Sequence, residues 1–371
     1  MWSTFDRQMM TRAIQLARQG QYTTRPNPNV GCVFTIDEQI LGEGYHQRTG
    51  QPHAEVNALI DADYRVEGAT AYVTLEPCSH FGLTPPCAQA LIDNNVSRVV
   101  VACLDSNPKV SGRGISMLEQ ANIQVDVGLY EQEAASLNLG FLKKMATGIP
   151  WVTVKVAASL DGKTALANGV SKWITGAEAR RDVQRLRLKH CAVVTGINTV
   201  LADDCSLNVR KSELGSIAEH LDEVLQPLRV VLDSNCRMPI DSKMLEIESP
   251  VLLVSTEPYP DAFTKQLPHY VTMLTLNAVN KRIDLNALLS YLGNDCNSVL
   301  VEAGATLAGG FIELGLADEL MLYQAPKILG SRGRNMLELP DYSAITEIPN
   351  LTLIDERKLG SDTRFRFQLR E

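Results

Sequence analysis

Short apolar runs alternate with helically spaced apolar residues along most of the chain, and this alternation limits the possible folds more than any other feature. In the first part, the pattern predicts strands at residues 30–36, 40–45, 71–75, 98–104 and 123–127. It predicts helices near 5–20, with Gly20 as the C-cap residue, and near 53–62, 88–93, 115–121 and 131–145. The first two strands are separated by Asp37-Glu38-Gln39 and are expected to form a hairpin. Such alternation is typical of a layered α/β sheet.

A break in this pattern divides the chain into two parts. The 371 residues exceed the roughly 250–300 at which a single hydrophobic core stops growing. The segment ATGIP at 146–150 ends a helical pattern just before a strand-like run at 151–157. The alternation then resumes, with strands expected at 192–195, 229–232 and 298–301, and Thr175 with Glu178 forms a capping-box pattern before a helix. We predict two α/β domains, residues 1–147 and 148–371.

The charge of the chain argues against a nucleic-acid partner. The formal net charge is -8 and the pI is near 5.4, whereas nucleic-acid surfaces are basic. A basic stretch on a predicted helix, Arg180, Arg181, Arg185, Arg187 and Lys189, is interpreted as a solvated face. A small-molecule partner is therefore expected.

Sequence patterns also favour a cytoplasmic protein with no membrane partner. The first twenty residues lack a basic leader followed by an apolar core, and no run of about 18 apolar residues occurs. In that compartment the eight cysteines are expected to be reduced thiols or metal ligands.

Four residues in the first part form the pattern that is most specific for chemistry. The motif PHAE, with His53 and Glu55, is followed by Cys78 and, nine positions later, by Cys87. One imidazole and two thiolates suit tetrahedral zinc with its fourth position open to water. Glu55 can approach this water without binding the metal, and it can alternate between base and acid, as replacing an aromatic amino group requires. The pattern predicts a zinc site that deaminates an amino-pyrimidine.

The spacing of the two cysteines departs from the general signature of zinc deaminases, in which H-x-E is followed by P-C-x-x-C. Here the eight residues SHFGLTPP separate them. A structural zinc site or a chance match are the alternatives. The other cysteines are expected to be small buried residues: Cys32, Cys103, Cys191, Cys205, Cys236 and Cys296.

Further motifs extend along nearly the whole chain. They are TRPNPNVGC, GEGYHQRTG and SNPKVSGRG in the first part, and VKVAASLDGKTA, SKWIT, TGINTVLADD, VLDS and VEAGATLAGGF in the second. Together with PHAE and LEPCSHFGLTPPC, they resemble the bifunctional deaminase/reductase family of riboflavin biosynthesis rather than the nucleic-acid deaminases.

For residues 1–147 the resemblance implies a cytidine-deaminase-like, three-layer α/β/α domain that hydrolyses the 2-amino group of 2,5-diamino-6-(5-phosphoribosylamino)pyrimidin-4(3H)-one. His53, Cys78 and Cys87 would hold the zinc ion, and Glu55 would carry the proton. Substrate-pocket positions of the family match Asn27, His46 and His80. The family has a basic residue, suited to the substrate phosphate, where this chain has Leu83; Arg113 is a candidate substitute.

For residues 148–371 the resemblance implies a dihydrofolate-reductase-like α/β domain. It would use NADPH to reduce the ribose of the deaminated product, giving 5-amino-6-(5-phosphoribitylamino)uracil. The family's cofactor positions match Ala157, Trp173, Thr199, Asp203, Ser234, Gly304, Ala305, Thr306, Leu307, Ala308, Gly309 and Gly310, and its substrate positions match Ser171, Arg187, Leu207, Arg210 and Glu302.

The residues themselves give some support to these positions. The run EAGATLAGG at 302–310 follows a predicted strand and leads into a helix ending near Gly315. Glycine allows close backbone approach and N–H groups at a helix start attract phosphate, although a structural turn explains the run equally well. The planar fork of Arg187 suits a phosphate.

Lys155 is the candidate that handles the ribose. A lysine among apolar residues is costly unless it faces a cleft or a partner, so we predict that it orients or polarises the sugar; an outward-facing strand residue is the alternative. Asp203 is the other candidate for the group that handles the proton in the reduction. It begins Asp203-Asp204-Cys205, where the family reads DDP.

The family resemblance also suggests a homodimer or a higher homo-oligomer. Two other functions remain to be weighed: a nucleic-acid deaminase with an appended binding domain, and a non-catalytic, zinc-stabilised ligand-binding protein.

Overall fold

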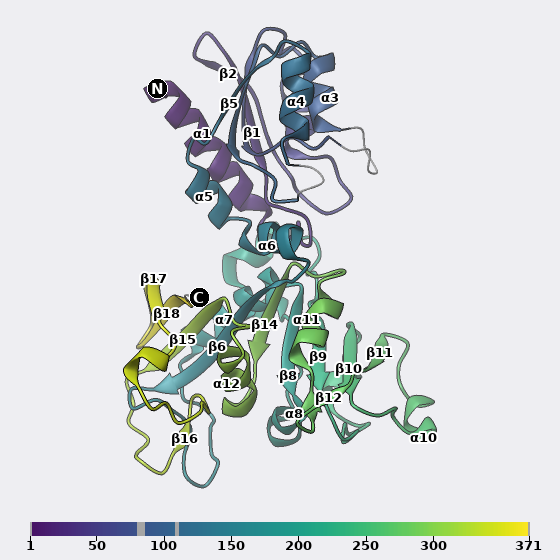
Figure 1. Cartoon of the computed structure of the whole chain (residues 1–371), viewed down its shortest axis with the longest axis vertical. Coiled ribbons are helices and arrows are strands. Elements are labelled where there is room, and N and C mark those ends of the chain that lie inside the picture. The colour runs from purple at the N-terminus through teal and green to yellow at the C-terminus, as the bar shows by residue number, and fades with distance from the viewer. Residues whose placement is uncertain (1, 80–85, 108–110, 370–371) are drawn as a thin grey trace. The chain divides into compact units, whose positions relative to one another are not determined.

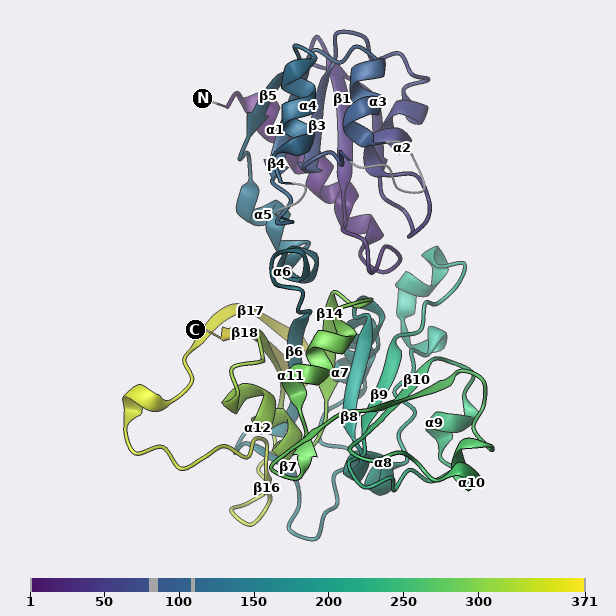
Figure 2. The same cartoon turned by 45° about the vertical axis from the view of Figure 1, so that its right-hand side comes forward.

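The computed structural model describes residues 2–79, 86–107 and 111–369. The chain divides into two compact units, unit 1 (Met1–Ile149) and unit 2 (Pro150–Glu371), which Figures 1 and 2 show from two directions. No helix in this described part combines the length and the apolar character needed to cross a membrane.

Unit 1 is built on a five-stranded sheet with the order β2-β1-β3-β4-β5. Its strands are β1 (Gly31–Ile36), β2 (Gln39–Tyr45), β3 (Thr70–Leu75), β4 (Arg98–Cys103) and β5 (Gln124–Val127). The pairs β1–β2 and β1–β3 are antiparallel, whereas β3–β4 and β4–β5 are parallel. The predicted hairpin is therefore present, and it forms one side of the sheet.

Helices cover both faces of this sheet, which makes the three layers expected for unit 1. They are α1 (Thr4–Ala17), α2 (Ala54–Asp61), α3 (Cys87–Asp93), α4 (Arg113–Gln120), α5 (Glu131–Ser136) and α6 (Leu139–Thr147). Figure 1 shows α1 and α5 on one side of the sheet, with α3 and α4 on the other. A continuous apolar core fills the space between the layers.

Two glycines set how closely the helices approach the hairpin. A Cβ atom on Gly31 of β1 would lie 2.0 Å from the carbonyl oxygen of Ala13 in α1. On the opposite face, a Cβ atom on Gly44 of β2 would lie 2.3 Å from the backbone nitrogen of Ala58 in α2. Only glycine permits this packing, which brings the N-terminus of α2 close to the sheet.

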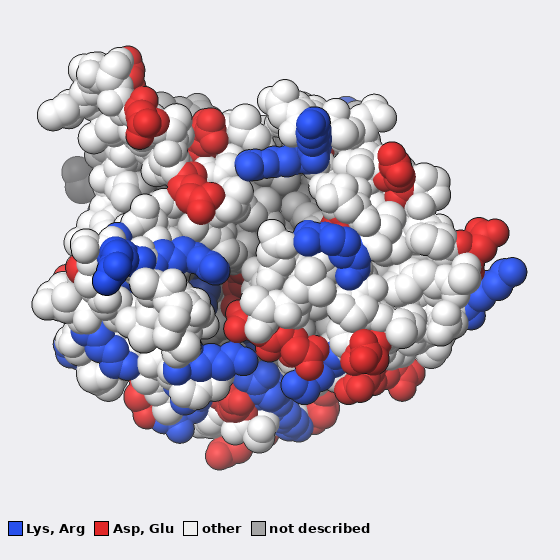
Figure 3. All heavy atoms as spheres, turned by 90° about the horizontal axis from the view of Figure 1, so that it is seen from below, with Lys and Arg blue, Asp and Glu red and all other residues white. Residues whose placement is uncertain are grey.

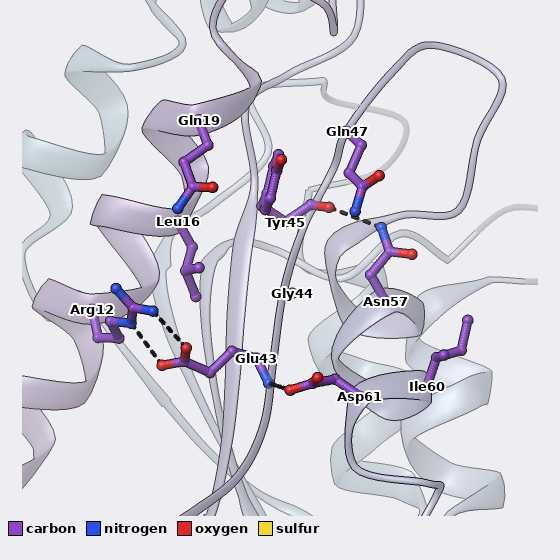
Figure 4. A pocket seen from close by; sticks show the side chains of 10 residues that line it. All are labelled: Arg12, Leu16, Gln19, Glu43, Gly44, Tyr45, Gln47, Asn57, Ile60 and Asp61. Carbon is purple, nitrogen blue, oxygen red and sulfur yellow. Dashed lines mark hydrogen bonds and ion pairs between the residues drawn. The ribbon is translucent and has the colours of Figure 1, made fainter. Parts of the chain in front are cut away.

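Side chains protect the edge of the sheet that β2 forms. Figure 4 shows a shallow groove along β2, where Arg12 of α1 pairs with Glu43 (2.6 Å). The N–H of Glu43 donates to Asp61 (2.8 Å), and the carbonyl oxygen of Tyr45 accepts from Asn57 (2.8 Å). These bonds occupy outward-facing backbone groups that an edge strand would otherwise offer to another chain. None of the predicted site residues lines this groove.

Unit 2 is built on a nine-stranded sheet with the order β11-β10-β9-β8-β14-β6-β15-β18-β17. The strands are β6 (Trp151–Ser159), β8 (Ala192–Gly196), β9 (Leu228–Leu232), β10 (Val251–Ser255), β11 (Val271–Thr275), β14 (Ser298–Glu302), β15 (Glu319–Ala325), β17 (Leu351–Leu359) and β18 (Asp362–Leu369). Every pair from β11 to β15 is parallel, and an antiparallel hairpin, β17–β18, adds to β15. The carboxyl ends of the parallel strands therefore lie along one edge.

Helices and two small ribbons surround this sheet. The helices are α7 (Ala177–Lys189), α8 (Ile197–Asp203), α9 (Lys243–Glu246), α10 (Asp261–Thr264), α11 (Leu285–Leu292) and α12 (Ala305–Glu313). One ribbon pairs β7 (Lys163–Ala165) with β16 (Arg334–Asn335), and the other pairs β12 (Ala278–Val279) with β13 (Arg282–Ile283). Four 3-10 turns complete the described elements: η1 (Arg18–Gly20), η2 (Lys211–Glu213), η3 (Gly215–His220) and η4 (Ile345–Glu347).

Two predictions about helix ends in unit 1 were wrong. Gly20 is not the C-cap of α1, which ends at Ala17; a Cβ atom on Gly20 would instead lie 2.6 Å from the carbonyl oxygen of His46. The single helix predicted at 131–145 is broken at Asn138, whose side chain exchanges two hydrogen bonds with the backbone of Asn29. Both departures arise from contacts between residues far apart in the sequence.

Two predictions in unit 2 and its loops also failed. Thr175 and Glu178 form no capping box; the N-cap of α7 is Gly176, whose N–H donates to Asp362 (2.6 Å), while Glu178 pairs with Arg181. Among the cysteines expected to be buried, Cys205 and Cys236 are only half-buried.

A buried ion pair closes one end of unit 1. The carboxylate of Asp6 accepts hydrogen bonds from the N–H of Ser3 (2.9 Å), the hydroxyl of Tyr72 (2.9 Å) and the guanidinium of Arg98 (2.7 Å). Burial by itself would raise the pKa of Asp6, but these bonds, that of Arg98 foremost, outweigh it and lower the pKa to about 2. The ion pair therefore links α1 to β3 and β4.

We expect Asp6→Asn to destabilise unit 1 by about 2 kcal/mol at pH 7, the value of a pKa lowered by nearly two units. Because the folded pKa lies below the unfolded one, this stabilisation is present above pH 4 and is lost as the pH falls towards 2. Urea unfolding of the full chain, with hydrogen exchange in α1 as the local signal, measures the difference. Asp37→Asn, in the exposed turn of the β1–β2 hairpin, is the matched control, and a pH-independent difference for Asp6→Asn would contradict the assignment.

Candidate active sites of the two units

The three predicted zinc ligands meet at one end of β3. His53 is the N-cap residue of α2, Cys78 follows β3, and Cys87 is the first residue of α3. Their ligand atoms all lie within 4.8 Å of one another. The Nδ1 atom of His53 lies 3.3 Å from the Sγ of Cys87 and 3.7 Å from the Sγ of Cys78.

These distances fit a tetrahedral zinc site. With zinc–sulfur bonds of about 2.3 Å and zinc–nitrogen bonds of about 2.1 Å, tetrahedral geometry places nitrogen and sulfur ligands about 3.6 Å apart. The two observed nitrogen–sulfur distances, 3.3 and 3.7 Å, lie on either side of that value. The backbone N–H of Cys87 also donates to the Sγ of Cys78 (3.3 Å). One nitrogen and two sulfur donors can therefore hold zinc without a change in the backbone.

The charge state of Cys78 suits metal binding. A hydrogen bond from Cys87, and a smaller contribution from His53, lower the pKa of the Cys78 thiol to about 4 despite its burial. The thiolate of Cys78 in turn raises the pKa of His53 through a hydrogen bond. The site thus carries a thiolate where zinc needs one.

Glu55 lies in the first turn of α2, two residues after His53, and is buried. Burial raises the pKa of its carboxyl group, and the nearby Cys78 thiolate raises it further. The carboxyl group is hydrogen-bonded to Cys87. It therefore adjoins the ligand set while remaining outside it.

Asn27 and His46 lie beside these ligands. The Nδ2 of Asn27 is 3.3 Å from the Nε2 of His46, and the Nδ1 of His46 is 3.1 Å from the carbonyl oxygen of Pro52. Because a carbonyl oxygen only accepts, Nδ1 carries the proton and Nε2 accepts from Asn27. Burial lowers the pKa of His46, and its ring meets that of His53 edge-on at 5.3 Å.

Two positions singled out in the sequence, His80 and Leu83, lie outside the described residues. Arg113 is exposed at the first position of α4. A neighbouring residue, Glu76, was missed by the sequence analysis.

Glu76 is buried directly after β3 and organises the loop that leads into α4. Its carboxylate accepts from the backbone N–H groups of Asp105 (3.3 Å), Gly112 (3.0 Å) and Gly114 (3.0 Å). The motif LEPC contains this residue, but its partners lie 29 or more positions away. Only the fold reveals that Glu76 connects the end of β3 to the loop beside it.

In unit 2, three charged residues predicted for the reductase site come together. Arg187 of α7 donates two hydrogen bonds to Glu302, the last residue of β14, through Nε (2.6 Å) and Nη2 (3.0 Å). The Nζ of Lys155, on β6, lies 3.9 Å from the same carboxylate. Strands β6 and β14 are neighbours, and Lys155 is the register partner of Glu302.

The environment of this cluster shifts the pKa values of Lys155 and Glu302. Burial lowers the pKa of Lys155, although the carboxylate of Glu302 opposes the shift. Burial would raise the pKa of Glu302, but the guanidinium of Arg187 outweighs it and the pKa is lowered. Tyr323 of β15, not foreseen from the sequence, places its ring 5.9 Å from the Nζ of Lys155 and donates its hydroxyl to Asp182 (2.8 Å).

A cavity of about 720 Å³ opens at the carboxyl ends of β14, β8 and β9. Of the predicted cofactor residues, it is lined by Thr199, Ser234, Gly304, Thr306, Leu307 and Gly310. Gly304 is the N-cap of α12, and no atom lies within 4 Å of the position that a Cβ atom would take there. This open space beside a helix N-terminus can hold a pyrophosphate, and the volume is typical of a cofactor pocket.

The remaining predicted reductase residues occupy other surroundings. Ala305 and Ala308 are buried in α12, and a Cβ atom on Gly309 would lie 1.9 Å from the carbonyl oxygen of Glu338. Ala157 lies on β6, Trp173 is exposed with its ring 4.5 Å from the Arg180 guanidinium, and Asp203 ends α8, 3.9 Å from the Nζ of Lys172. Ser171 is half-buried in a mostly exposed loop, Leu207 is buried, and Arg210 pairs with Glu213.

Comparisons with known proteins identify the family. Residues 3–103 match the family model of the cytidine and deoxycytidylate deaminase zinc-binding region, and residues 150–365 match that of the RibD C-terminal domain. The riboflavin biosynthesis protein RibD of Escherichia coli K12 is 46% identical over 361 residues, covering 96% of this chain and 97% of its own. The chain belongs to the RibD family.

Solved structures of RibD proteins agree with this assignment. RibD of Acinetobacter baumannii is 46% identical, with a TM-score of 0.90 and 99% of each chain covered. A deaminase/reductase of Thermotoga maritima is 31% identical, with a TM-score of 0.85, and the match covers 98% of this chain and 99% of that one. The RibD family fold therefore extends through both units, with a cytidine-deaminase-like unit 1 and a RibD reductase unit 2.

Proposed function

We propose that this chain catalyses two consecutive steps of riboflavin biosynthesis. Unit 1 hydrolyses 2,5-diamino-6-(5-phosphoribosylamino)pyrimidin-4(3H)-one, releasing ammonia from its 2-amino group. Unit 2 then reduces the ribosyl group with NADPH and yields 5-amino-6-(5-phosphoribitylamino)uracil. The observation that carries this proposal is the convergence of His53, Cys78 and Cys87 beside the buried Glu55, in a chain that belongs to the RibD family throughout.

In unit 1, His53, Cys78 and Cys87 would hold zinc, which supplies the Lewis acidity that activates the attacking water. Glu55 then handles the protons. Its carboxylate accepts one proton from the attacking water and delivers it to a ring nitrogen of the pyrimidine. It then takes the proton of the hydroxyl group that has been added to C2 and gives it to the departing amine, so that a carbonyl group and ammonia form. The bond to oxygen forms, the C–N bond breaks, and ammonia leaves. Burial raises the pKa of the Glu55 carboxyl group, which suits a group that must donate a proton as well as accept one.

Asn27 and His46 would orient the pyrimidine in this site. The hydrogen bond from Asn27 to Nε2 keeps His46 neutral and fixes the side-chain amide. The amide oxygen of Asn27 then remains available as an acceptor for an N–H group of the substrate. A neutral imidazole beside the ligands also avoids placing a second positive charge next to the metal.

In unit 2, Lys155 is the group that we assign to the sugar. NADPH supplies the hydride that reduces C1′ of the ribose. As the C1′–O4′ bond breaks, the ammonium group of Lys155 donates a proton to the departing ring oxygen. Burial lowers the pKa of Lys155, which makes this proton easier to transfer. Asp203 is the weaker candidate because it lies near Lys172 at the end of α8 rather than in the buried cluster.

The NADPH site is assigned to the cavity bordered by Gly304. The first turn of α12 would receive the pyrophosphate, and Thr199 and Ser234 would offer hydroxyl groups to the ribose and phosphate oxygens. Glu302 ends β14 two residues before Gly304, so the strand that leads to this loop also carries the carboxylate that pairs with Lys155.

We also propose that the chain self-associates through the edge strand β17. Leu351, Leu353 and Ile354 of this strand are exposed by 45, 51 and 48%, and β17 ends the nine-stranded sheet. A second copy could continue the sheet there and cover these side chains, which are costly to leave in water.

Sedimentation velocity measures the oligomeric state. Leu353→Glu should convert a dimer into a monomer, whereas a wild-type monomer would contradict the proposal.

A cytoplasmic location is part of the same proposal. The two thiolate ligands must stay reduced to bind zinc, and disulfides rarely form in that compartment. Consistent with this, none of the eight cysteines, all of which lie in the described residues, forms a disulfide bond.

We expect Glu55→Gln to lower the rate of ammonia release from the diaminopyrimidine phosphate by about 10²–10⁴-fold, the usual contribution of a general acid–base group. The variant should retain its zinc, because Glu55 is not among the ligands. Cys87→Ser should lose both zinc and activity, and Cys236→Ser, a half-buried cysteine outside the site, should lose neither. Equal rates for wild type and Glu55→Gln, with metal content measured in the same preparations, would refute the role of Glu55.

For the reductase, we expect Lys155→Met to slow NADPH oxidation with the deaminated intermediate by about 10²–10⁴-fold. The KM for NADPH should stay the same, since Lys155 is assigned to the sugar and is not among the residues that line the cavity assigned to the coenzyme. Stopped-flow absorbance at the NADPH band measures both values. If Asp203→Asn lost activity while Lys155→Met stayed fully active, the role of proton donor would belong to Asp203 and not to Lys155.

A further inference from the structure

Three cations line the cavity of unit 2. They are Arg237, after β9, and Lys281 and Arg282, in the β12–β13 hairpin. We propose that these residues bind the 2′-phosphate of NADPH and thereby select it over NADH. This inference rests on the proposed reductase function, to which it adds the basis of coenzyme choice.

The strand order determines which end of the coenzyme reaches these cations. Lys155 is on β6, and the strands that follow across the sheet are β14, β8 and β9. Three strand spacings, about 14 Å, separate β6 from β9. If the nicotinamide lies near Lys155 and the pyrophosphate near Gly304, the adenosine end extends towards β9. Arg237 follows that strand.

The hairpin presents its cations in a fixed geometry. Asn280 and Lys281 form its two-residue turn and have φ values of 50° and 63°. Two consecutive positive φ angles are those of a type I′ turn, which matches the twist of the two strands. The hairpin from Val279 to Ile283 lines the cavity, so its turn forms a defined wall and not a loose loop.

Arg237 is anchored by another residue that lines the cavity. Its Nη2 donates to the Oδ1 of Asn198 (2.8 Å), in the first turn of α8. A guanidinium group has five N–H donors in one plane, so further donors remain for a phosphate. Seen from the end of unit 2 that carries α8 and the β12–β13 hairpin, Lys and Arg side chains flank a hollow in the surface (Figure 3).

The carboxylates nearby do not suit NADH. Enzymes that select NAD place an acidic side chain on the ribose 2′-hydroxyl. Asp233, directly after β9, is fully buried and accepts from the N–H of Met238 (2.7 Å) and the hydroxyl of Tyr259 (2.8 Å). Asp284 lines the cavity but caps the N-terminus of α11. The other lining carboxylate, Glu313, is the last residue of α12, at the opposite end of that helix from Gly304.

The test compares ligands that differ only in the phosphate. Isothermal titration calorimetry of the full chain with 2′,5′-ADP and with 5′-AMP measures recognition of the 2′-phosphate without turnover. Wild type should bind 2′,5′-ADP more tightly. Because each cation would contribute one charged hydrogen bond to the phosphate from an exposed position, each of Arg237→Gln and Lys281→Gln should weaken the binding of 2′,5′-ADP about 10-fold. The double variant should weaken it about 100-fold, and none should change 5′-AMP.

Steady-state kinetics should show the same selectivity. The KM for NADPH should rise about 10-fold in each single variant, while the KM for NADH and both kcat values stay the same. The preference for NADPH should also fall as salt is added. Lys265→Gln, which removes an exposed positive charge outside the cavity of unit 2, should behave as wild type.

The outcomes separate this inference from the proposed function. Equal binding of 2′,5′-ADP and 5′-AMP by wild type, or loss of both ligands together in the variants, would overturn the role of the three cations while the reductase function stands. No binding of either nucleotide, together with no NADPH oxidation, would overturn the reductase function itself.

Discussion

Both candidate sites depend on one constraint, namely that parallel strands end side by side at the carboxyl edge of a sheet. In unit 1, β3 ends just before Glu76 and Cys78, and its parallel neighbour β4 ends just before the loop that Glu76 holds. In unit 2, β8, β9 and β14 end at Gly196, Leu232 and Glu302, and the cavity begins there. Residues distant in the sequence meet at these edges because the hydrogen-bond register aligns the strand ends.

Buried carboxylates stabilise these edges in two different ways. Glu76 is satisfied by three backbone N–H groups, so its charge fixes a loop. Glu302 is satisfied by two side-chain cations, Arg187 and Lys155, so its charge fixes a reactive cluster. Removing one partner of such a buried pair leaves an uncompensated charge and is much more costly than losing an exposed pair. The backbone N–H groups around Glu76 are suited to making a site rigid. The cations around Glu302 are suited to controlling the charge inside a site.

Local sequence was sufficient to predict part of this structure. The cluster of His53, Cys78 and Cys87 was predicted from the sequence, and the structure brings their ligand atoms together, because the motifs PHAE and PC mark these residue types in the chain. The predicted strands β1, β2, β3, β4, β5, β6, β8, β9 and β14 were placed to within two residues because most of them are continuous apolar runs. The strands β10, β11, β15, β17 and β18 of the large sheet were not predicted. Helix ends were harder: the break at Asn138 depends on Asn29, and the N-terminus of α7 depends on Asp362. Glu76 and Tyr323 were missed for the same reason, since their partners come from other elements. The cations of the β12–β13 hairpin carried no signal in the sequence, because only the fold brings them to the cavity that also contains Gly304.

Arg187 lies in the predicted reductase cluster, but its contacts favour another role than the one expected from the sequence. Its guanidinium group was expected to bind a substrate phosphate, yet two of its nitrogens, Nε and Nη2, donate to the carboxylate of Glu302. Two cations, Arg187 and Lys155, face one carboxylate, so the cluster keeps one net positive charge in a buried setting. An anionic substrate would still be attracted there, since charges interact more strongly away from water. The ion pair with Glu302 would then serve chiefly to hold Lys155 in place, and phosphate recognition would fall to cations that have no buried carboxylate beside them. Arg210 is the candidate among the predicted residues, because its partner Glu213 is half-exposed and such pairs exchange readily with other anions.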